Sequence, residues 1–390
     1  MIDRVLFFTV LSLITIGVIS SYTLSSYTVK FHGYDDFHFV IREVATASIS
    51  IFIIWLLARQ NPDKSLHIVG FTLFFGGFAL MIAMPFLPSE YVQAVGGAKR
   101  WIKLPLFSIA PVEFFKIGFV YFLAWSFSRK YSDNSELSVA DELKRFVPYG
   151  AIFFVSIIFI AILQNDLGQV VVLTGTLAVF LAFAGSSMKF FIALGTAASG
   201  VLFAVIVFSE HRISRILSWW ASAQNSILVI FPESIASHLR VENASEGYQI
   251  GHSLNAIHNG GLFGTGLGGG TFKLGFLSEV HTDFVLAGLA EEFGFLGVFI
   301  VTMLFIVLIL RIFRIANRIN NSAYSLFSIG VGLVITFAFL INAYGISGII
   351  PIKGIAVPFL SYGGSNMLAS AVGIGMVLMI SKNIHKRERL

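Results

Sequence analysis

Ten long apolar runs set the first limit on what this chain can fold into. Each is about twenty residues long, the length that a helix rising 1.5 Å per residue needs to cross the hydrocarbon core of a bilayer. The runs are residues 5–25, 39–57, 67–87, 108–128, 147–165, 167–185, 189–208, 284–310, 324–345 and 366–381. They predict an all-α polytopic membrane protein with ten transmembrane helices.

The composition points to the same fold class. Of the 390 residues, 56% are hydrophobic and only 12% are charged, and the mean hydropathy is +0.84. A soluble globular domain is far more polar. The first run follows a short polar start without a small-residue cleavage pattern, so we expect a retained span and not a removed signal peptide. The absence of cysteine excludes disulfides and says nothing about the compartment.

Lysine and arginine predict the orientation. If the N-terminus is cytoplasmic, the inside segments hold Arg4, Arg59, Lys64, Arg129, Lys130, Lys144, Arg145, Lys189, Arg311, Arg314, Arg318, Lys382, Lys386, Arg387 and Arg389. The positive-inside rule favours that arrangement. Both termini then lie in the cytoplasm, and a large outer loop, 209–283, joins the seventh and eighth helices of one membrane domain, 1–390. We expect the basic C-terminal tail to meet anionic lipid and not nucleic acid.

Several cations fall on the outer side in spite of this bias. They are Lys99, Arg100, Lys103, Arg212, Arg215, Arg240, Lys273 and Lys353. An anionic ligand at the outer face would account for them. Lys99 and Arg100 precede Trp101, a residue suited to the membrane interface, where arginine can hold a phosphate through two hydrogen bonds. The alternative is that these two cations snorkel at a helix end.

Two further motifs place acidic groups among apolar residues. Glu113 and Lys116 are i,i+3 neighbours on one helical face, and they predict an ion pair that neutralises itself within a membrane helix. We expect that pair to be structural more than a direct contact with substrate. Asp166 lies in the sharp 164–168 break between two runs. It could fix the turn through an Asx bond, bind a metal or take protons, and turn chemistry is the favoured of these roles.

The 209–283 loop contains two patterns of its own. Residues 227–239 are amphipathic and are expected to lie along the membrane surface. The letters GTGLGG at 264–269 match the dinucleotide fingerprint G-x-G-x-x-G. We reject that interpretation, because the fingerprint needs a strand before it and a helix after it within a βαβ unit. The glycines instead favour tight turns and a close approach of the backbone to a ligand.

An ionisable cluster ends this loop. His281, Thr282 and Asp283 stand immediately before the run 284–310, where a membrane helix would meet water. A charge at such a depth indicates function by default, although Asp283 could instead only cap the helix N-terminus. The proline- and glycine-punctuated segment 351–365 leads into the last run. Non-helical backbone there needs protein or a wet cavity around it, which predicts a pocket.

Together the motifs resemble those of the SEDS family (shape, elongation, division and sporulation), the FtsW/RodA-type peptidoglycan glycosyltransferases. They are GAKRWI at 97–102, APVEFFK at 110–116, QNDLG at 164–168, HRISR at 211–215, GYQIGHS at 247–253, GGLFGTGLG at 260–268, HTDFVLAGLAEEFGFLG at 281–297 and PIKGIAVPFLSYGGS at 351–365. The GTGLGGGTFKLGFL spacing and the lysine in PIKGIAVPF are more similar to the division branch than to the elongation branch. The chain departs from the family at Asn165, usually proline, and at His252, usually glutamine.

The resemblance implies an enzyme that polymerises lipid II at the outer face of the cytoplasmic membrane during septal wall synthesis. It makes Asp283 the catalytic carboxylate of the T-D-F element, with Glu113, Lys116, Asp166 and His281 in supporting roles. A carboxylate can take the proton of the attacking sugar hydroxyl while cations stabilise the departing pyrophosphate. The candidates for binding substrate are Lys99, Arg100, Arg212, Arg215, Lys273, Lys353 and Ser361.

The same resemblance implies cofactors and partners. No organic cofactor is indicated, and a divalent cation, Mg²⁺ or Mn²⁺, could bridge the phosphates with Asp166, although no ligand cluster in the sequence requires one. The implied partners are lipid II, the undecaprenyl pyrophosphate-linked glycan, a single-span class B penicillin-binding transpeptidase and other division proteins, at the inner membrane of the septum.

Two other functions fit parts of the sequence. Helix breaks, intramembrane charges and glycine-rich gates also suit a flippase for lipid-linked precursors, but the unusual ionisable residues gather on the expected outer side, whereas a flippase needs them along a path into the cytoplasmic half. A non-catalytic scaffold for division partners would explain the spans and leave Asp283 and the outer cations without a role.

Overall fold

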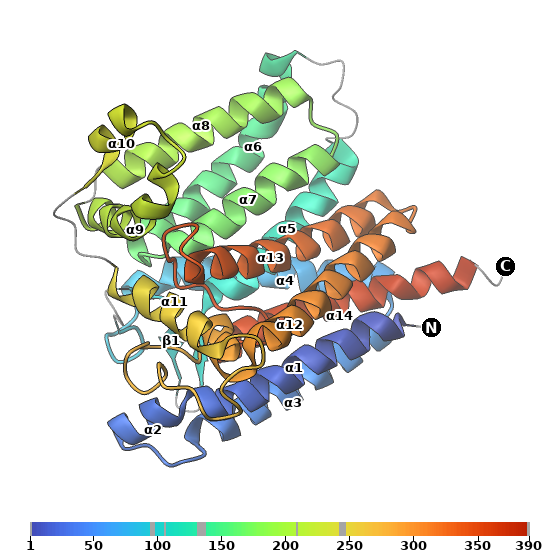
Figure 1. Cartoon of the computed structure of the whole chain (residues 1–390). Helices are drawn as coiled ribbons and strands as arrows, with labels where there is room; N and C mark the ends of the chain where they lie inside the picture. The colour runs from blue at the N-terminus through green and yellow to red at the C-terminus, as the bar shows by residue number, and fades with distance from the viewer. Residues whose placement is uncertain are drawn as a thin grey trace.

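The computed structural model describes residues 2–93, 98–104, 107–130, 138–207, 210–241 and 247–387. Over this part of the chain the fold is almost entirely helical (Figure 1). Its α-helices are α1 (Arg4–Leu24), α2 (Ser26–His32), α3 (His38–Arg59), α4 (Pro62–Ala83), α5 (Pro111–Lys130), α6 (Val139–Ile158), α7 (Leu167–Phe183), α8 (Met188–Val207), α9 (Glu210–Leu228), α10 (Glu233–Leu239), α11 (Tyr248–Gly260), α12 (Val285–Asn317), α13 (Ser322–Ile346) and α14 (Gly364–Arg387). Two short strands, β1 (Ile102–Lys103) and β2 (Ser108–Ile109), pair antiparallel before α5.

Two short helical turns extend this list. A 3₁₀ turn, η1 (Met84–Phe86), follows α4, and a π-helical turn, η2 (Phe159–Leu163), follows α6.

Seven helices in the described residues are long and apolar enough to cross a membrane. They are Arg4–Leu24, His38–Arg59, Pro62–Phe86, Val139–Leu163, Val285–Asn317, Ser322–Ile346 and Gly364–Asn383. The other three apolar runs of the sequence also fold as helices, namely α5, α7 and α8. α5 carries the charged Glu113 and Lys116 near its start, and α7 has 17 residues. The prediction of a multi-pass helical membrane protein is confirmed.

Three helices form the centre of the bundle. The apolar windows of α13 and α14 are 78% and 83% buried, against 22% for α3. α5 packs against α4, α13 and α14 and fully buries Phe115, Phe119 and Phe127. Outer helices instead leave large apolar side chains exposed, such as Phe52 and Phe75, as lipid-facing positions require. Polar groups carried by the three central helices are therefore shielded from lipid by protein.

Small residues let α4 and α5 pack closely. A Cβ atom on Gly118 would lie 2.2 Å from the backbone nitrogen of Phe74, and one on Gly77 would lie 2.9 Å from the Cα atom of Phe115. Helices in lipid associate largely through such close van der Waals contact. This packing fixes the start of α5, and with it the charged pair, inside the bundle.

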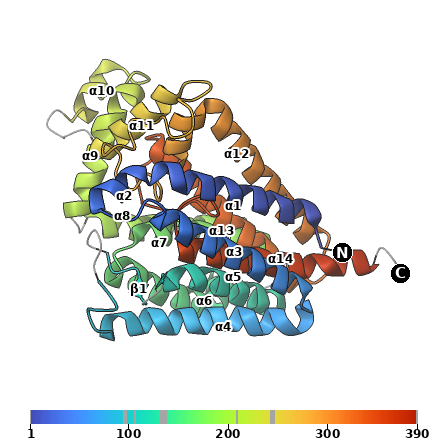
Figure 2. The ribbon, with the colours of Figure 1, turned by 90° about the horizontal axis from the view of Figure 1, so that it is seen from below.

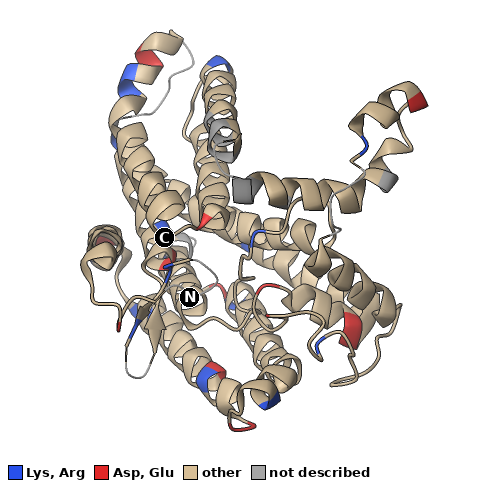
Figure 3. Cartoon of the chain, turned by 90° about the vertical axis from the view of Figure 1, so that its left-hand side faces the viewer, with Lys and Arg blue, Asp and Glu red and all other residues tan. Residues whose placement is uncertain are grey.

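The two ends of the bundle differ. The chain termini lie together at one end, and α9, α10 and α11 lie at the other (Figures 1 and 2). We call the second the loop end. Charged residues are sparse along the ribbon and gather near helix ends and in connecting segments (Figure 3). Of the cations used to predict the orientation, Arg389 lies outside the described residues.

The segment expected as a large loop, 209–283, is itself largely helical in the described residues. It contains α9, α10 and α11. The amphipathic stretch 227–239 is divided between two helices, because α9 ends at Leu228 and α10 begins at Glu233 after Pro232. Proline lacks the N–H that would continue the helix through this point.

The glycine-rich segment after α11 packs its backbone against a break in α12. Gly294, inside α12, has φ 67° and ψ −168°, which interrupts the helical hydrogen bonds. The carbonyls of Glu291 and Glu292 accept hydrogen bonds from the loop instead, from Thr265 N (2.9 Å) and Gly266 N (3.0 Å). Every backbone group at membrane depth needs such a partner.

Backbone groups of α12 also donate hydrogen bonds to the glycine-rich segment. The backbone N–H groups of Phe295 and Leu296, just past the break, donate to the carbonyls of Gly261 (2.9 Å) and Leu262 (3.2 Å). The loop therefore replaces the missing part of the helix on both sides. The glycines of this segment allow a close backbone approach to α12.

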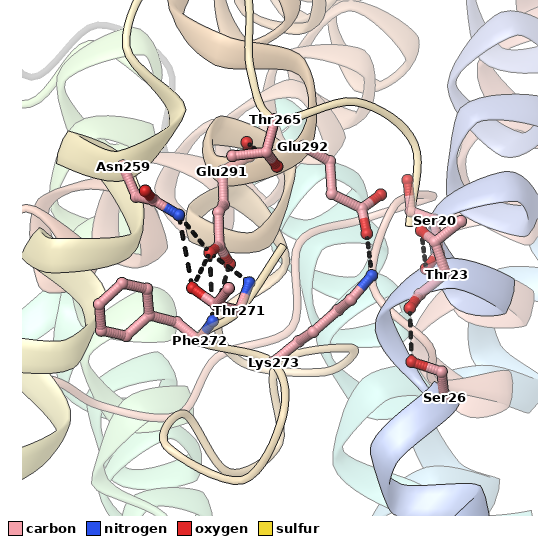
Figure 4. Close-up of polar contacts among 10 residues, drawn as sticks. All are labelled: Ser20, Thr23, Ser26, Asn259, Thr265, Thr271, Phe272, Lys273, Glu291 and Glu292. Atoms are coloured by element: carbon pink, nitrogen blue, oxygen red, sulfur yellow. Dashed lines mark hydrogen bonds and ion pairs between the residues drawn. The ribbon is translucent and has the colours of Figure 1, made fainter. Parts of the chain in front are cut away.

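A buried carboxylate fastens the end of the same segment (Figure 4). Glu291 Oε1 accepts hydrogen bonds from Thr271 N (2.6 Å), Phe272 N (3.1 Å) and Asn259 Nδ2 (2.9 Å). Charged acceptors of this kind form the stronger class of hydrogen bonds. The loop that leads toward Asp283 is thus anchored to α12 by both backbone and side chain.

The break in α12 yields a test by substitution. A methyl group on Gly294 would lie 2.4 Å from the backbone nitrogen of Gly264 at a φ of 67°. Because backbone atoms cannot easily move aside, we expect Gly294→Ala to cost about 2–4 kcal/mol and to lower the melting temperature in detergent by roughly 5 °C or more. Gly76→Ala in α4 is the control, since an added Cβ there meets nothing within 4 Å. Equal melting temperatures for the two variants would contradict the close contact.

Candidate functional site

The backbone of Asp283 is fixed from the core. Asp283 lies at the loop end, two residues before α12 begins. Asn342 on α13 donates through Nδ2 to the carbonyl of Asp283 (2.7 Å) and to the carbonyl of Ile355 (2.7 Å). One buried amide thus joins the start of α12 to the irregular segment before α14. An amide in this position satisfies two carbonyls that the membrane could not.

A turn before α14 closes over the same residues. Ser361 Oγ donates to the carbonyl of Thr282 (2.6 Å) and accepts from Val357 N (2.8 Å). Tyr362 N donates to the carbonyl of His281 (2.8 Å). The irregular 351–365 segment is buried or half-buried, and its hydrogen bonds hold the two residues that precede Asp283. Ser361 was predicted to bind substrate. In the structure, both hydrogen bonds of its hydroxyl are made to backbone groups.

The carboxylate of Asp283 itself remains available. Its side chain is half-buried, and no residue in the described part of the chain donates a hydrogen bond to it. α12 begins after Phe284 without a side-chain cap, so the alternative in which Asp283 serves only as a cap is wrong. Gly354, with φ +59°, lies against the carboxylate, because a Cβ there would be 2.8 Å from Asp283 Oδ2. A glycine leaves that carboxylate room.

Asp166 and Arg100 form an ion pair beside Asp283. Arg100 Nε lies 3.1 Å from Asp166 Oδ2, and Asp166 Oδ1 accepts a hydrogen bond from Gln169 N (3.3 Å). Asp166 is therefore the N-cap of α7, which is the turn role predicted for it. Asn165 takes φ 52° at this turn, a conformation that asparagine tolerates better than most residues. Burial raises the pKa of Asp166, and Arg100 opposes the shift.

These charges act together on Asp283. The pKa of Asp283 is raised to about 6, mainly by burial; Arg100 opposes this shift, and Glu279 and Asp166 add to it. A carboxyl group with this pKa is mostly ionised at neutral pH yet binds a proton readily. That combination suits a general base. The next residue but one, His281, is buried, and burial lowers its pKa, so its imidazole is neutral at pH 7.

The ion pair expected from the spacing of Glu113 and Lys116 is present. Lys116 Nζ lies 2.8 Å from Glu113 Oε2, and both side chains are buried. Gln169 bridges them, donating to Glu113 Oε1 (2.7 Å) and accepting from Lys116 (2.6 Å), while Asn366 donates to Glu113 Oε2 (3.1 Å). A buried pair needs this kind of added hydrogen bonding to offset its desolvation. The network ties α5, α7 and α14 together next to the Asp166 cap.

Lys273 differs from the prediction. It was expected to contact pyrophosphate, but its Nζ lies 2.6 Å from Glu292 Oε1, and the two side chains are only 2% and 1% exposed (Figure 4). The reason is the fold of the glycine-rich segment, which turns Lys273 inward against α12. This placement argues against substrate contact by Lys273.

The other predicted cations are placed less tightly around the carboxylate. Lys99, next to Arg100, is exposed, and Lys353, next to Gly354, is half-buried. Arg212 and Arg215 lie on α9, and their side chains are outside the described part of the structure. The structure thus brings Arg100, Asp166 and Asp283 together. Lys99 is the sequence neighbour of Arg100, and Lys353 is the sequence neighbour of Gly354, which lies against the Asp283 carboxylate.

A resident metal has little support from the side chains. Within the described residues no group of three or more His, Cys, Asp or Glu side chains could hold a metal ion. Asp166 is already paired with the positive charge of Arg100. A divalent ion here would depend on Asp283 and on oxygens supplied by a phosphate ligand.

Sequence reasoning missed three polar residues that build the site. Asn342, Gln169 and Asn366 each lie within or at the edge of an apolar run, and each hydrogen-bonds to a residue far along the chain. The signal that could have found them is a polar side chain inside a run otherwise able to cross the membrane.

Fold and site together define a multi-pass helical membrane protein with a buried polar centre that leads to one available carboxylate at the loop end. The model for the FtsW/RodA/SpoVE family, described as cell cycle protein, matches residues 3–386. The chain belongs to this family, and the resemblance drawn from its motifs is confirmed.

Similar proteins share most of the chain. It is 51% identical, over 97% of its length, to a probable peptidoglycan glycosyltransferase FtsW of Helicobacter pylori and covers 98% of that protein. It is 34% identical to a protein of the same description from Coxiella burnetii, over 90% of this chain and 87% of that one. Stage V sporulation protein E of Bacillus subtilis is 30% identical, with 97% of each chain covered.

Two solved structures share the fold. A chain from a peptidoglycan synthase complex, solved in work on the structural coordination of polymerization and crosslinking, superposes with a TM-score of 0.73 at 20% identity, covering 99% of both chains. The rod shape determining protein RodA of Thermus thermophilus superposes with a TM-score of 0.66 at 19% identity, covering 98% of this chain and 97% of that one.

Proposed function

We propose that this protein is a peptidoglycan glycosyltransferase that polymerises lipid II into glycan strands for septal wall synthesis in cell division. The observation that carries the proposal is the carboxylate of Asp283, which has a pKa of about 6 and accepts no hydrogen bond from the described residues. It belongs to the His281–Phe284 element that carries the family's T-D-F motif, in a chain 51% identical to a curated FtsW.

Asp283 acts as the general base. The 4-hydroxyl oxygen of one lipid-linked disaccharide attacks the anomeric carbon of another, and its proton passes to the Asp283 carboxylate. The bond from that carbon to the undecaprenyl pyrophosphate breaks, and the bonding electrons leave with the pyrophosphate. A base positioned in this way contributes about 10²–10⁴-fold to rate. The backbone bonds from Asn342, Ser361 and Tyr362 keep the residues around the carboxylate in place before substrate arrives.

Cations near the base receive the leaving charge. Arg100 is the first candidate, because it already acts electrostatically on Asp283. Lys99 directly precedes Arg100 in the sequence, and Lys353 directly precedes Gly354, which lies against the Asp283 carboxylate. Arg212 and Arg215 on α9 are further candidates. Fixed positive groups stabilise charge as it develops on the pyrophosphate. A divalent cation, Mg²⁺ or Mn²⁺, held by Asp283 and phosphate oxygens, would supply the same stabilisation.

The site faces the outer side of the cytoplasmic membrane. In this arrangement all ten apolar helices span the bilayer, both termini are cytoplasmic, and 209–283 lies outside within one membrane domain, 1–390. The position of the termini opposite α9 to α11 supports it (Figures 1 and 2), as does the distribution of lysine and arginine.

The enzyme works beside a crosslinking partner. A polymerase makes strands that another enzyme must join, and one structure with this fold comes from a peptidoglycan synthase complex. We infer a single-span class B penicillin-binding transpeptidase as partner, with other division proteins, at the septal inner membrane.

The first test removes the base. Asp283→Asn keeps the size of the side chain and loses the proton acceptor, so glycan synthesis from labelled lipid II should fall by roughly 10²–10⁴-fold in purified protein with its transpeptidase. Folding should survive, since the carboxylate holds no described hydrogen bond. Asp141→Asn, at an exposed position on α6, is the matched control and should stay fully active. Glu113→Gln should reduce the yield of folded protein more than the rate per folded molecule.

Long glycan chains from well-folded Asp283→Asn protein would remove the base assignment. Wild-type protein that moves lipid II across vesicles without polymerising it would instead identify a flippase.

The second test is the pH dependence. The base is active only when ionised, so a pKa of about 6 for Asp283 means that activity is present above pH 6 and lost as the pH falls through that value. At pH 5 the rate should be about one tenth of the plateau. Arg100→Gln should move this acidic limb to higher pH, because the guanidinium lowers the pKa of Asp283. A limb near pH 4, the ordinary value for aspartate, would contradict the assignment.

The third test is sidedness. The chain has no cysteine, so single cysteines report cleanly. A membrane-impermeant maleimide applied to intact cells should label Ser278→Cys in the outer segment and should label Lys64→Cys, at an exposed position in the first turn of α4, only after the cells are opened. The cysteine-free parent is the blank. Labelling of Lys64→Cys in intact cells would reverse the proposed topology.

A further inference from the structure

A second acidic residue lies close to the site and has no role so far. Glu43 sits in α3, an apolar helix long enough to span the membrane, and its side chain is 1% exposed. Its Oε1 atom has no hydrogen-bond partner in the described residues. An ionisable group buried at such a position is costly and indicates a function. No described lysine or arginine forms an ion pair with it within 4.0 Å.

The carboxylate of Glu43 lies at the turn beside the catalytic residue. The backbone N–H of Gly363 acts on it as a donor. Gly363 directly follows Ser361 and Tyr362, which bond to the carbonyls of Thr282 and His281. The bonds therefore lead from α3, through one turn, to the two residues before Asp283.

The same face of α3 contacts both segments through an aromatic ring. Phe39 lies one helical turn before Glu43, on the same side of the helix. Its ring centroid is 4.9 Å from that of His281 and 5.0 Å from that of Tyr362, both with edge-on geometry. Phe39 thus contacts both the turn and the His281 segment, and Glu43 lies at the same turn.

We propose that Glu43 is a positioning residue for Asp283, holding the 357–363 turn so that the catalytic carboxylate stays aimed at the acceptor hydroxyl. The role rests on the proposed function of Asp283. What the position requires is an acceptor oxygen for the N–H of Gly363, and a negative charge is not required. An amide oxygen should therefore replace the carboxylate, and a side chain of similar length without oxygen should not.

The test compares two variants of Glu43 in the purified complex with the transpeptidase. Glu43→Gln keeps the acceptor, so its kcat should stay within about threefold of wild type. Glu43→Met loses the acceptor, and its kcat should fall by roughly 10–100-fold, the scale set by a misplacement of about 1 Å. KM for lipid II should change by less than about threefold in both, because Glu43 does not touch substrate. Hydrogen exchange of the 357–363 backbone should rise in Glu43→Met alone.

Glu142→Met is the matched control. Glu142 is a buried carboxylate on α6 that accepts from Ser187 N (3.1 Å), between α6 and α8 and outside the site. Its loss should lower stability and leave kcat per folded molecule unchanged. If Glu43→Met behaves in the same way, with full kcat and unchanged exchange at 357–363, the positioning role is refuted. Wild-type complex that makes no glycan would refute the proposed function, while the exchange measurement would still decide whether Glu43 holds the turn.

Discussion

Backbone N–H and C=O groups at the edge of a membrane need hydrogen-bond partners within the protein. The irregular segments of the site supply such partners to each other. The start of α12 and the segment before α14 are both irregular, and each satisfies the other through Asn342, Ser361 and Tyr362. The break at Gly294 is resolved in the same way, by a loop that donates and accepts the missing helical bonds. Irregular backbone at this depth is tolerated only under such cover. The arrangement leaves Asp283 fixed by its main chain and not by its side chain.

Because only the main chain of Asp283 is held, its carboxylate is left free to act as a base. In a carboxylate that serves as a helix cap, the backbone donors stabilise the charge and act to lower the pKa. Asp283 lacks such donors in the described residues, and burial instead raises its pKa to about 6. Arg100 keeps the pKa from rising further and is itself held by Asp166, which in turn caps α7. The buried network of Glu113, Lys116 and Gln169 lies directly behind that cap.

The sequence predicted those features that depend on local pattern. The apolar runs fall on helices, the i,i+3 spacing of Glu113 and Lys116 gives their ion pair, and Asp166 caps a helix at a turn. It failed where a tertiary approach decides the partner. Lys273 pairs with Glu292 because the glycine-rich segment folds back on α12. The spacing of residues in the sequence does not predict that this segment folds back. Glu43 and Asn342 were missed because a single polar residue in an apolar run shows its purpose only when its distant partner is known.

The most direct test of the central claim is a structure of the Asp283→Asn protein, in complex with its transpeptidase, trapped with lipid II bound. We expect the 4-hydroxyl oxygen of the acceptor sugar within about 3 Å of the side chain at position 283, the reach of a general base, with the pyrophosphate of the donor near Arg100. Sugars bound at the opposite end of the bundle, beside the chain termini, would contradict it.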